Sequence, residues 1–299
     1  MMDTQVTLSQ RLDKAHDALK DANLAFEVKE AQIINNHTYD PSTKYKMLYR
    51  DDTNDELGIV GMQYSPVQNA EAFAFFDTIT SKHDIKYTNV HQFNNGGIIQ
   101  LTATFDKKET ILPGDDIEKQ IILKNGHDGM HGLNIDFMVN RLVCTNGLRA
   151  NVKDAKNSFK IKHTYAIHWK MEQIIKLMDS ANKYFDRFIE SARVLAQKNV
   201  DTKLVNDFLD EVVGEIKEKE TNKGGNNLRE KKRESILDLF ATGKGNHGKT
   251  AWDLYNAVTE YYDHFHGKDE NRLANKYIGN LNVKEKAWDF LVDRTATYC

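Results

Sequence analysis

Apolar and polar residues alternate at every second position in several short stretches of the first half of the chain. The alternation is clear in residues 98–105, which follow the sequence Asn94-Asn95-Gly96-Gly97. Alternation of this kind is typical of half-buried strands, and Asn-Gly sequences favour tight hairpin turns. We therefore predict an antiparallel hairpin of strands at 85–93 and 99–105, and a second hairpin of strands at 118–124 and 133–144 around a turn at 125–129. Strands near 44–50 and 57–64 and a short helix at 69–79 are also predicted.

The second long strand has an arginine at an unusual place. Its apolar side consists of Leu133, Ile135, Phe137 and Val139, and strict alternation puts Arg141 on that same side. An inward arginine needs an anionic or carbonyl partner, because burying the charge without one is expensive. A β-bulge before Arg141 would instead turn the side chain outward. The sequence leaves both alternatives open.

The second half of the chain has helical spacing. Apolar residues recur every three or four positions over four heptads in residues 167–195, which predicts a long helix packed against another helix of this chain or of a second subunit. No proline follows Pro113, as a helix-rich region allows. Further helices are predicted at the N-terminus through about Phe26 and at 200–219, 228–240, 250–266 and 283–293.

These patterns predict an α+β fold: an antiparallel, hairpin-rich sheet packed against long helices, with a helical C-terminal region. The predicted organisation is an N-terminal amphipathic helix and arm at 1–40, an α+β core with the long helix at 41–220, a linker at 221–227, and a helical region at 228–299. The linker prediction depends on the run Asn222-Lys223-Gly224-Gly225-Asn226.

Composition narrows the class of protein. The 299 residues are 40% hydrophobic and 28% charged, enough to form a core. No apolar stretch reaches the ~18 residues of a membrane span, and the N-terminus lacks a signal-peptide pattern, so we expect a soluble, cytoplasmic protein. Cys144 and Cys299 are too few for a disulfide framework, and neither lies in a motif that favours nucleophilic catalysis.

Positive charge is concentrated in one segment. Residues 141–170 contain seven basic residues and one aspartate, a net charge of +6, whereas the other 269 residues carry −9. A basic segment in an acidic protein favours an anionic partner such as nucleic acid, although surface lysines can also be merely solvated. The predicted nucleic-acid-binding residues are Arg141, Arg149, Lys153, Lys156, Lys160 and Lys162 for phosphates, with His163 in the same groove and Tyr165, Trp169 or Phe159 for stacking on bases.

Residues 243–250 match the phosphate-binding sequence G-x-x-x-x-G-K-T of nucleotide hydrolases. That loop follows a buried strand, whereas this one follows an amphipathic segment that ends near Phe240. We predict a connection between helices in which Thr250 is the N-cap, and no nucleotide or other cofactor.

Two pairs of residues have spacings seen in metal sites: His127 with Asp128, and Glu260 with His264. Neither pair supplies three convergent ligands by itself. They are weak candidates, and no metal is predicted.

Several blocks of the sequence resemble a phage/plasmid-like family that carries a large domain of unknown function and occurs mainly in phages and mobile elements. The blocks are 64–69 with 71–73, 123–129, 141–146, 162–164, and 250–252 with 256–261 and His264. They follow the expected order from about residue 40 to the C-terminus.

The resemblance implies a role in phage DNA metabolism, in the cytoplasm of the host. A hairpin-rich sheet with flanking helices is also similar in outline to annealing proteins of the Rad-fifty-two type, which is an analogy of fold alone. Our first hypothesis is an ATP-independent, homo-oligomeric protein that binds and anneals single-stranded DNA during recombination. The alternatives are a metal-dependent nuclease or nucleotide-modifying enzyme that uses His127, Asp128, Glu260 and His264, and a host-directed interaction protein without catalysis.

Overall fold

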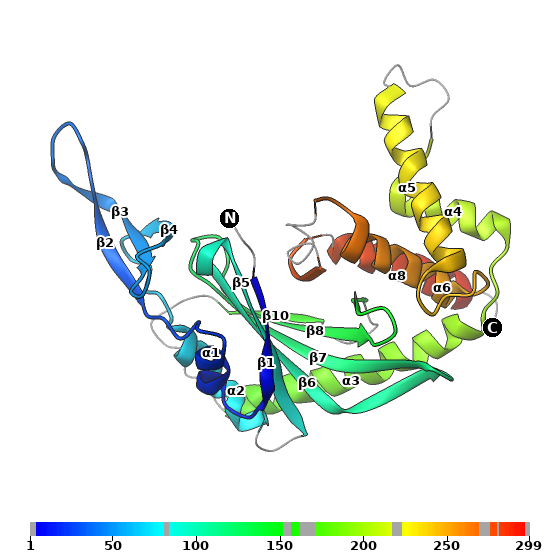
Figure 1. Ribbon diagram of the computed structural model, residues 1–299, viewed down its shortest axis with the longest axis horizontal. Coiled ribbons are helices and arrows are strands. Elements are labelled where there is room, and N and C mark those ends of the chain that lie inside the picture. Colours follow the sequence, from blue (N-terminus) through cyan, green and yellow to red (C-terminus); the bar gives the residue numbers. More distant parts are fainter. Residues whose placement is uncertain are drawn as a thin grey trace. The chain divides into compact units, whose positions relative to one another are not determined.

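The structure is a computed structural model, and it describes residues 4–80, 84–151, 157–161, 171–216, 223–268, 276–279 and 281–296. These residues form antiparallel sheets and helices, with a helical C-terminal region (Figure 1). The predicted α+β fold class is confirmed.

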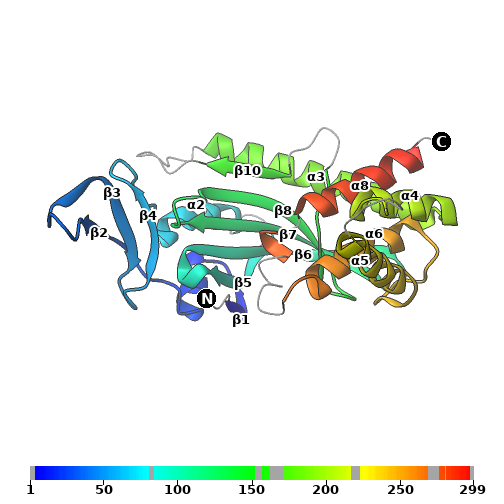
Figure 2. The same ribbon diagram turned by 90° about the horizontal axis from the view of Figure 1, so that it is seen from above.

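The larger sheet contains most of the predicted hairpin strands. Its strand order is β1-β5-β6-β7-β8-β10, with β9 paired to β8, and a smaller sheet has the order β2-β3-β4. Both views show β2, β3 and β4 side by side (Figure 2). The strands are β1 (Thr4–Leu12), β2 (Val28–Ile34), β3 (Pro41–Arg50), β4 (Glu56–Gly61), β5 (Ile85–Phe93), β6 (Ile98–Leu112), β7 (Asp115–Gly126), β8 (Leu133–Arg141), β9 (Asn146–Leu148) and β10 (Ser158–Ile161).

The helices dominate the second half of the chain. They are α1 (Ala15–Asp21), α2 (Asn69–Thr80), α3 (Met171–Gln197), α4 (Thr202–Val213), α5 (Lys223–Thr242), α6 (Ala251–Glu260) and α8 (Leu281–Ala296), with a 3-10 turn η1 (Asn94–Gly96) and a π-helical turn η2 (Tyr261–Phe265). No helix in the described ranges is long and apolar enough to cross a membrane.

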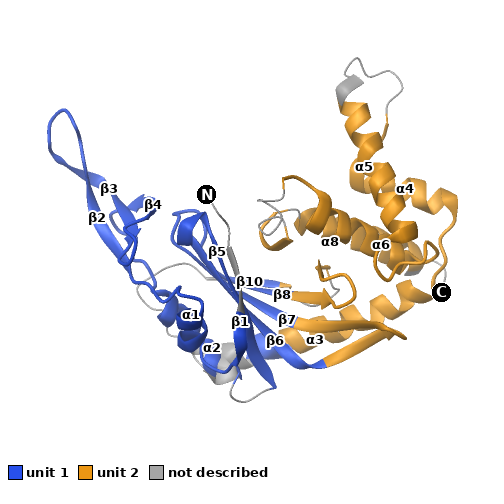
Figure 3. Cartoon of the chain, in the orientation of Figure 1, with its two compact units in different colours: residues 1–107, 120–137, 158–179 blue, residues 108–119, 138–157, 180–299 orange. Residues whose placement is uncertain are grey.

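The chain forms two compact units, each assembled from three segments (Figure 3). Unit 1 comprises residues 1–107, 120–137 and 158–179, and unit 2 comprises residues 108–119, 138–157 and 180–299. The two units therefore alternate along the chain. This division places the beginnings and ends of β6, β7 and β8 in different units.

Unit 1 has its apolar core on one side of the larger sheet. Helices α1 and α2 pack on each other and on β5. Leu19, Phe73 and Phe76 of these helices are fully buried, as are Leu101 and Ala103 of β6. Burial of each large apolar side chain contributes about 1.5–3 kcal/mol, so these contacts hold the sheet and helices together.

Unit 2 has an aromatic core around the second half of α3. Phe188 stacks on Trp288 of α8 with 4.5 Å between ring centroids, and Trp288 also contacts Tyr255 of α6. The apolar residues of the predicted stripe that are described in this unit, Ala181, Phe185, Phe188, Ala192 and Leu195, are all buried. This part of the stripe therefore packs against helices of its own chain, as one of the two alternatives predicted, and not against a second subunit.

Two predictions of local structure are wrong. The N-terminal helix was expected to extend through Phe26, but residues 4–12 form β1 and only 15–21 are helical. Pairing with β5 overrides the helical pattern. Residues 223–227, which were predicted to be part of a linker, belong to α5. Each glycine in a helix destabilises it by about 1 kcal/mol, and packing of α5 on α4 and α6 offsets this cost.

Candidate nucleic-acid interface

Arg141 at the end of β8 points inward. Its side chain is completely buried, and Arg141 pairs with Asn146 of β9 in a regular antiparallel register. The outward turn by a bulge is therefore wrong, and the inward alternative is confirmed.

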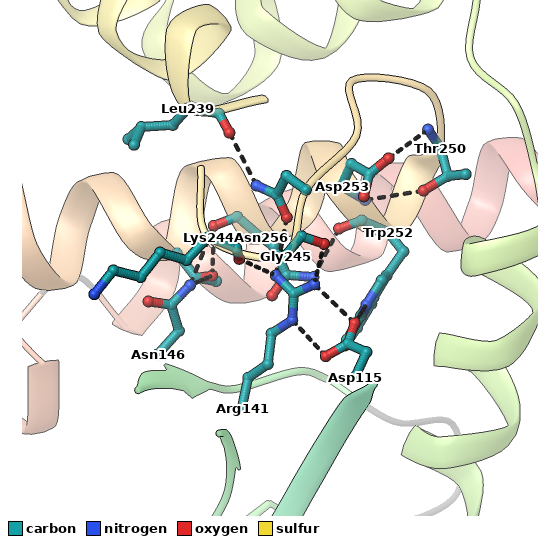
Figure 4. Close-up of polar contacts among 12 residues, drawn as sticks. Asp115, Arg141, Asn146, Leu239, Lys244, Gly245, Thr250, Trp252, Asp253 and Asn256 are labelled. Atoms are coloured by element: carbon teal, nitrogen blue, oxygen red, sulfur yellow. Dashed lines mark hydrogen bonds and ion pairs between the residues drawn. The ribbon is translucent and has the colours of Figure 1, made fainter. Parts of the chain in front are cut away.

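The guanidinium of Arg141 has partners for all five of its N–H groups (Figure 4). Nε and Nη2 each donate to a carboxylate oxygen of Asp115 at 2.7 Å. Nη2 also donates to the Gly245 carbonyl at 2.8 Å, and Nη1 donates to the Lys244 carbonyl and to Asn246 Oδ1. A paired, planar interaction of this kind fixes both partners and leaves no donor for a phosphate.

Asp115 and the adjacent aromatic ring complete this cluster. Trp252 Nε1 donates to Asp115 Oδ2 at 2.8 Å, and the guanidinium of Arg141 lies 5.7 Å from the centre of the Trp252 ring. Burial by itself lowers the pKa of Arg141, but the hydrogen bonds and charge of Asp115 raise it above its usual value. Arg141 therefore stays charged and acts as a structural cation.

The glycine-rich loop 243–250 connects α5 to α6, as predicted. Thr250 is the N-cap of α6, and its side chain and that of Asp253 form a reciprocal capping box. Gly245 has φ +74°, and a Cβ at this position would lie 2.7 Å from Val143 Cγ1. The loop directs the carbonyls of residues 244 and 245 at Arg141, whereas a phosphate loop directs N–H groups at its ligand.

A second polar cluster holds the turn between β8 and β9. Asn146 donates to Thr259 Oγ1 at 3.2 Å, and its Oδ1 lies 3.1 Å from His264 Nε2. Burial lowers the pKa of His264. The His264 ring thus fixes a backbone turn by contacting the side chain of Asn146.

The same turn is bound from η2 and α8. Asp263 accepts a hydrogen bond from the Gly147 N–H at 2.9 Å and pairs with Lys284, which also donates to the Gly147 carbonyl. Burial lowers the pKa of Lys284, and the negative charge of Asp263 opposes this shift. Nearby, burial raises the pKa of Cys144 to about 11, so this thiol is protonated at neutral pH.

Arg149 is also withdrawn from the surface. It is 9% exposed, and its Nε donates to Glu285 Oε1 at 2.9 Å. The assignment of Arg141 and Arg149 as phosphate contacts needs correction, because alternation and short loops place both side chains inside unit 2, where carboxylates neutralise them.

The metal candidates divide between the units. His127 and Asp128 belong to unit 1, and Glu260 and His264 belong to unit 2. His127 Nε2 lies 3.0 Å from Asn69 Oδ1, and Asp128 holds the turn that contains His131. In the part of the chain that the structure describes, no group of three His, Cys, Asp or Glu residues is placed to hold a metal ion.

Lys160 is the predicted phosphate contact that the structure describes at the surface. It is exposed on β10, at one end of the strand order of the larger sheet. It lies directly opposite Asn134 of β8, and residues opposite each other in antiparallel strands share a face. Lys153, Lys156, Lys162, His163, Tyr165 and Trp169 lie outside the described residues.

The face that Lys160 shares is polar across neighbouring strands of unit 1. Asp136, two residues from Asn134, accepts a hydrogen bond from Lys124 of β7 at 2.9 Å. Gln120, on the same side of β7 as Lys124, reaches Thr104 of β6 at 3.4 Å. We define the polar face as His91, Gln100, Thr102, Thr104, Gln120, Lys124, Asn134, Asp136 and Lys160.

Sequence reasoning missed this face. The alternation in β6 indicated that Gln100, Thr102 and Thr104 would be on the solvent side, but all three are at most 1% exposed. The signal in the sequence was the concentration of glutamine and threonine, with a lysine and an aspartate, on one side of adjacent strands, although Ile122 lies between Gln120 and Lys124 on that side.

The family described as Domain of unknown function (DUF932) matches residues 56–288. The chain belongs to the DUF932 family. The match includes β5 to β8, the glycine-rich loop and the first half of α8, so both the polar face and the Arg141 cluster lie within the DUF932 region. Comparison with curated proteins and with solved structures gave no match.

Proposed function

We propose that this DUF932 protein binds and anneals single-stranded DNA without ATP, as a homo-oligomer, in the DNA metabolism of a phage or mobile element. The observation that carries the proposal is the place of Lys160. It is the exposed cation at the edge of the polar face, within the most basic segment of the chain.

Two of the predicted phosphate contacts are left out of this proposal. With Arg141 and Arg149 committed to buried ion pairs, the proposed contacts are Lys153, Lys156, Lys160 and Lys162, with His163 beside them. Tyr165 and Trp169 are the proposed stacking residues, whereas Phe159 contacts Phe137 on the opposite face from Lys160. Phosphate contacts of this kind give affinity with little dependence on base sequence.

Two further observations support this function. The glycine-rich loop is a helix connection whose carbonyls bind Arg141, which fits a protein that works without ATP. The larger sheet ends at β1 and β10 in the described residues, and strand edges are common places for assembly of subunits.

The test compares binding of a short fluorescent single strand at several salt concentrations. The double variant Lys160→Ala/Lys162→Ala removes two proposed phosphate contacts, so the log–log salt slope should decrease by about 1–2. The control Lys20→Ala/Lys203→Ala removes the same charge from exposed positions of α1 and α4 and should leave the slope unchanged.

Annealing and assembly are measured on the same preparations. The unmodified protein should accelerate pairing of complementary strands without ATP, and light scattering should give a mass several times 34.4 kDa. If the unmodified protein binds no single strand even at low salt, the proposed function is wrong. If it binds as a monomer and does not accelerate annealing, the function is reduced to binding alone.

A further inference from the structure

One phenylalanine of unit 2 presents its ring to solvent. Phe265, the last residue of the π-helical turn η2, is 55% exposed. Among the phenylalanines whose burial the structure describes, it is the only exposed one. A single exposed apolar side chain is common in proteins, so the meaning of Phe265 depends on what surrounds it.

The turn that carries Phe265 is held firmly. The His266 N–H donates to the Tyr261 carbonyl at 2.8 Å, which closes the π-type turn. Tyr261 and Tyr262 are buried, their rings pack edge to face, and the Tyr262 ring centre lies 5.0 Å from that of His266. Single π-helical turns are rare and occur often at functional sites. The exposed ring therefore stands on a fixed support.

Helix α5 brings positive charge to this turn. It packs on η2, and its residues 229–233 include four basic residues and one glutamate. Arg233 is paired with an aspartate of α4, whereas Lys231 and Lys232 form no ion pair within the described part of the chain. Burial lowers the pKa of His266, and the charge of Lys232 lowers it further. The Lys232 ammonium thus lies close to the residue that follows Phe265.

We propose that Phe265, Lys231 and Lys232 form a second contact for single-stranded DNA, on unit 2. A base stacks on the Phe265 ring, and the two lysines bind phosphates beside it. This inference rests on the proposed function and adds to it a stacking residue that the structure describes at the surface. Exposed rings next to cations bind single strands with little sequence preference, because every base has a flat face.

The first experiment changes the ring alone. Phe265→Leu keeps an apolar side chain but removes the aromatic face, so affinity for a 12-nucleotide single strand should decrease about tenfold. The salt slope should stay the same, since no charge is lost. Phe265→Tyr should retain the affinity. Tyr45→Leu is the matched control, because Tyr45 of β3 is 54% exposed, and it should leave binding unchanged.

The second experiment changes the charge alone. Lys231→Ala/Lys232→Ala should lower the log–log salt slope by about 1, and the control Lys20→Ala/Lys203→Ala should not. The melting temperatures of all these variants should match that of the unmodified protein, since the substituted side chains lie at the surface.

The outcomes separate this inference from the proposed function. If Phe265→Leu and the Lys231/Lys232 double variant bind the strand as the unmodified protein does, the inference is wrong, and a reduced slope in Lys160→Ala/Lys162→Ala would still support the proposed function. If Phe265→Leu changes the mass measured by light scattering, the ring contacts another subunit, which also overturns the inference. An unmodified protein that binds no single strand overturns both.

Discussion

Arg141 in unit 2 and Gln100 in unit 1 are both completely buried polar side chains, but they differ in how fully they are hydrogen-bonded. Every N–H group of Arg141 has an acceptor, whereas the side-chain oxygen of Gln100 has no partner among the described residues. Burial alone therefore does not show how completely a polar side chain is hydrogen-bonded. The difference lies in whether the fold itself supplies the partners.

The two regions also differ in what they connect. The Arg141 cluster joins the Asp115 end of β7, the end of β8, the glycine-rich loop and α6, which are far apart in sequence. The polar face joins neighbouring strands that already share backbone pairing. The cluster therefore connects separate segments of unit 2, whereas the polar face connects strands that are already paired.

The largest effect should come from separating Arg141 and Asp115. Arg141→Met leaves the Asp115 carboxylate buried without its counter-ion, and Asp115→Leu leaves the arginine in the same state. Each single variant should lose about 3–5 kcal/mol of unfolding free energy, measured by urea denaturation. The double variant should lose much less than the sum of the two, because it removes both charges. Additive losses would contradict the central place of this ion pair.

Glu260, near the Arg141 cluster in unit 2, differs from the fully hydrogen-bonded residues of that cluster. It is 5% exposed, and its Oε2 has no partner among the described residues. Burial raises the pKa of Glu260, while the Lys244 N–H and the charges of Arg141 and Lys244 oppose the rise. The negative charge of Glu260 contributes, after burial, to the raised pKa of the Cys144 thiol.

A pH titration of stability tests this exception. Folding raises the pKa of Glu260 above its usual value of 4.5. At a pH between this usual pKa and the raised pKa of the folded state, folded protein therefore binds more protons than unfolded protein. Stability from this group is full below pH 4.5 and is lost as pH rises through the folded pKa. Glu260→Gln should therefore be more stable than the unmodified protein at pH 7–8, with the difference shrinking toward pH 4. An equal difference at all pH values would show that proton uptake by Glu260 does not matter.

Local sequence patterns predicted many of the strands and helices, because turn residues, alternation and helix caps act over a few neighbouring residues. The Asn94–Gly97 turn and the alternation on either side of it correctly placed β5 and β6, and the threonine at 250 correctly marked the start of α6. The strand at residues 4–12 was missed because its conformation depends on pairing with β5, about 80 residues away. Such pairing leaves little trace in the local sequence.

The candidate site was harder to predict for the same reason. Counting charges selected Arg141 and Arg149, since the count cannot distinguish a surface cation from one paired with Asp115 or Glu285. The alternation around Arg141 did indicate burial, but its partners lie up to 105 residues away. The polar face was not foreseen, because β6 alone does not show that both of its sides are buried.

The smallest effect is expected in the glycine-rich loop, where the sequence most resembles a catalytic motif. Lys249 is exposed, so Lys249→Ala should change the unfolding free energy by less than about 0.5 kcal/mol. It should leave DNA binding unchanged, with or without ATP. Thr250→Ala, one residue further on, removes the N-cap of α6 and should cost about 1 kcal/mol in the same denaturation experiment. This contrast separates a capping loop from a phosphate loop, in which the lysine would matter more than the loss of the cap. Micromolar ATP binding that disappears in Lys249→Ala would reverse this interpretation.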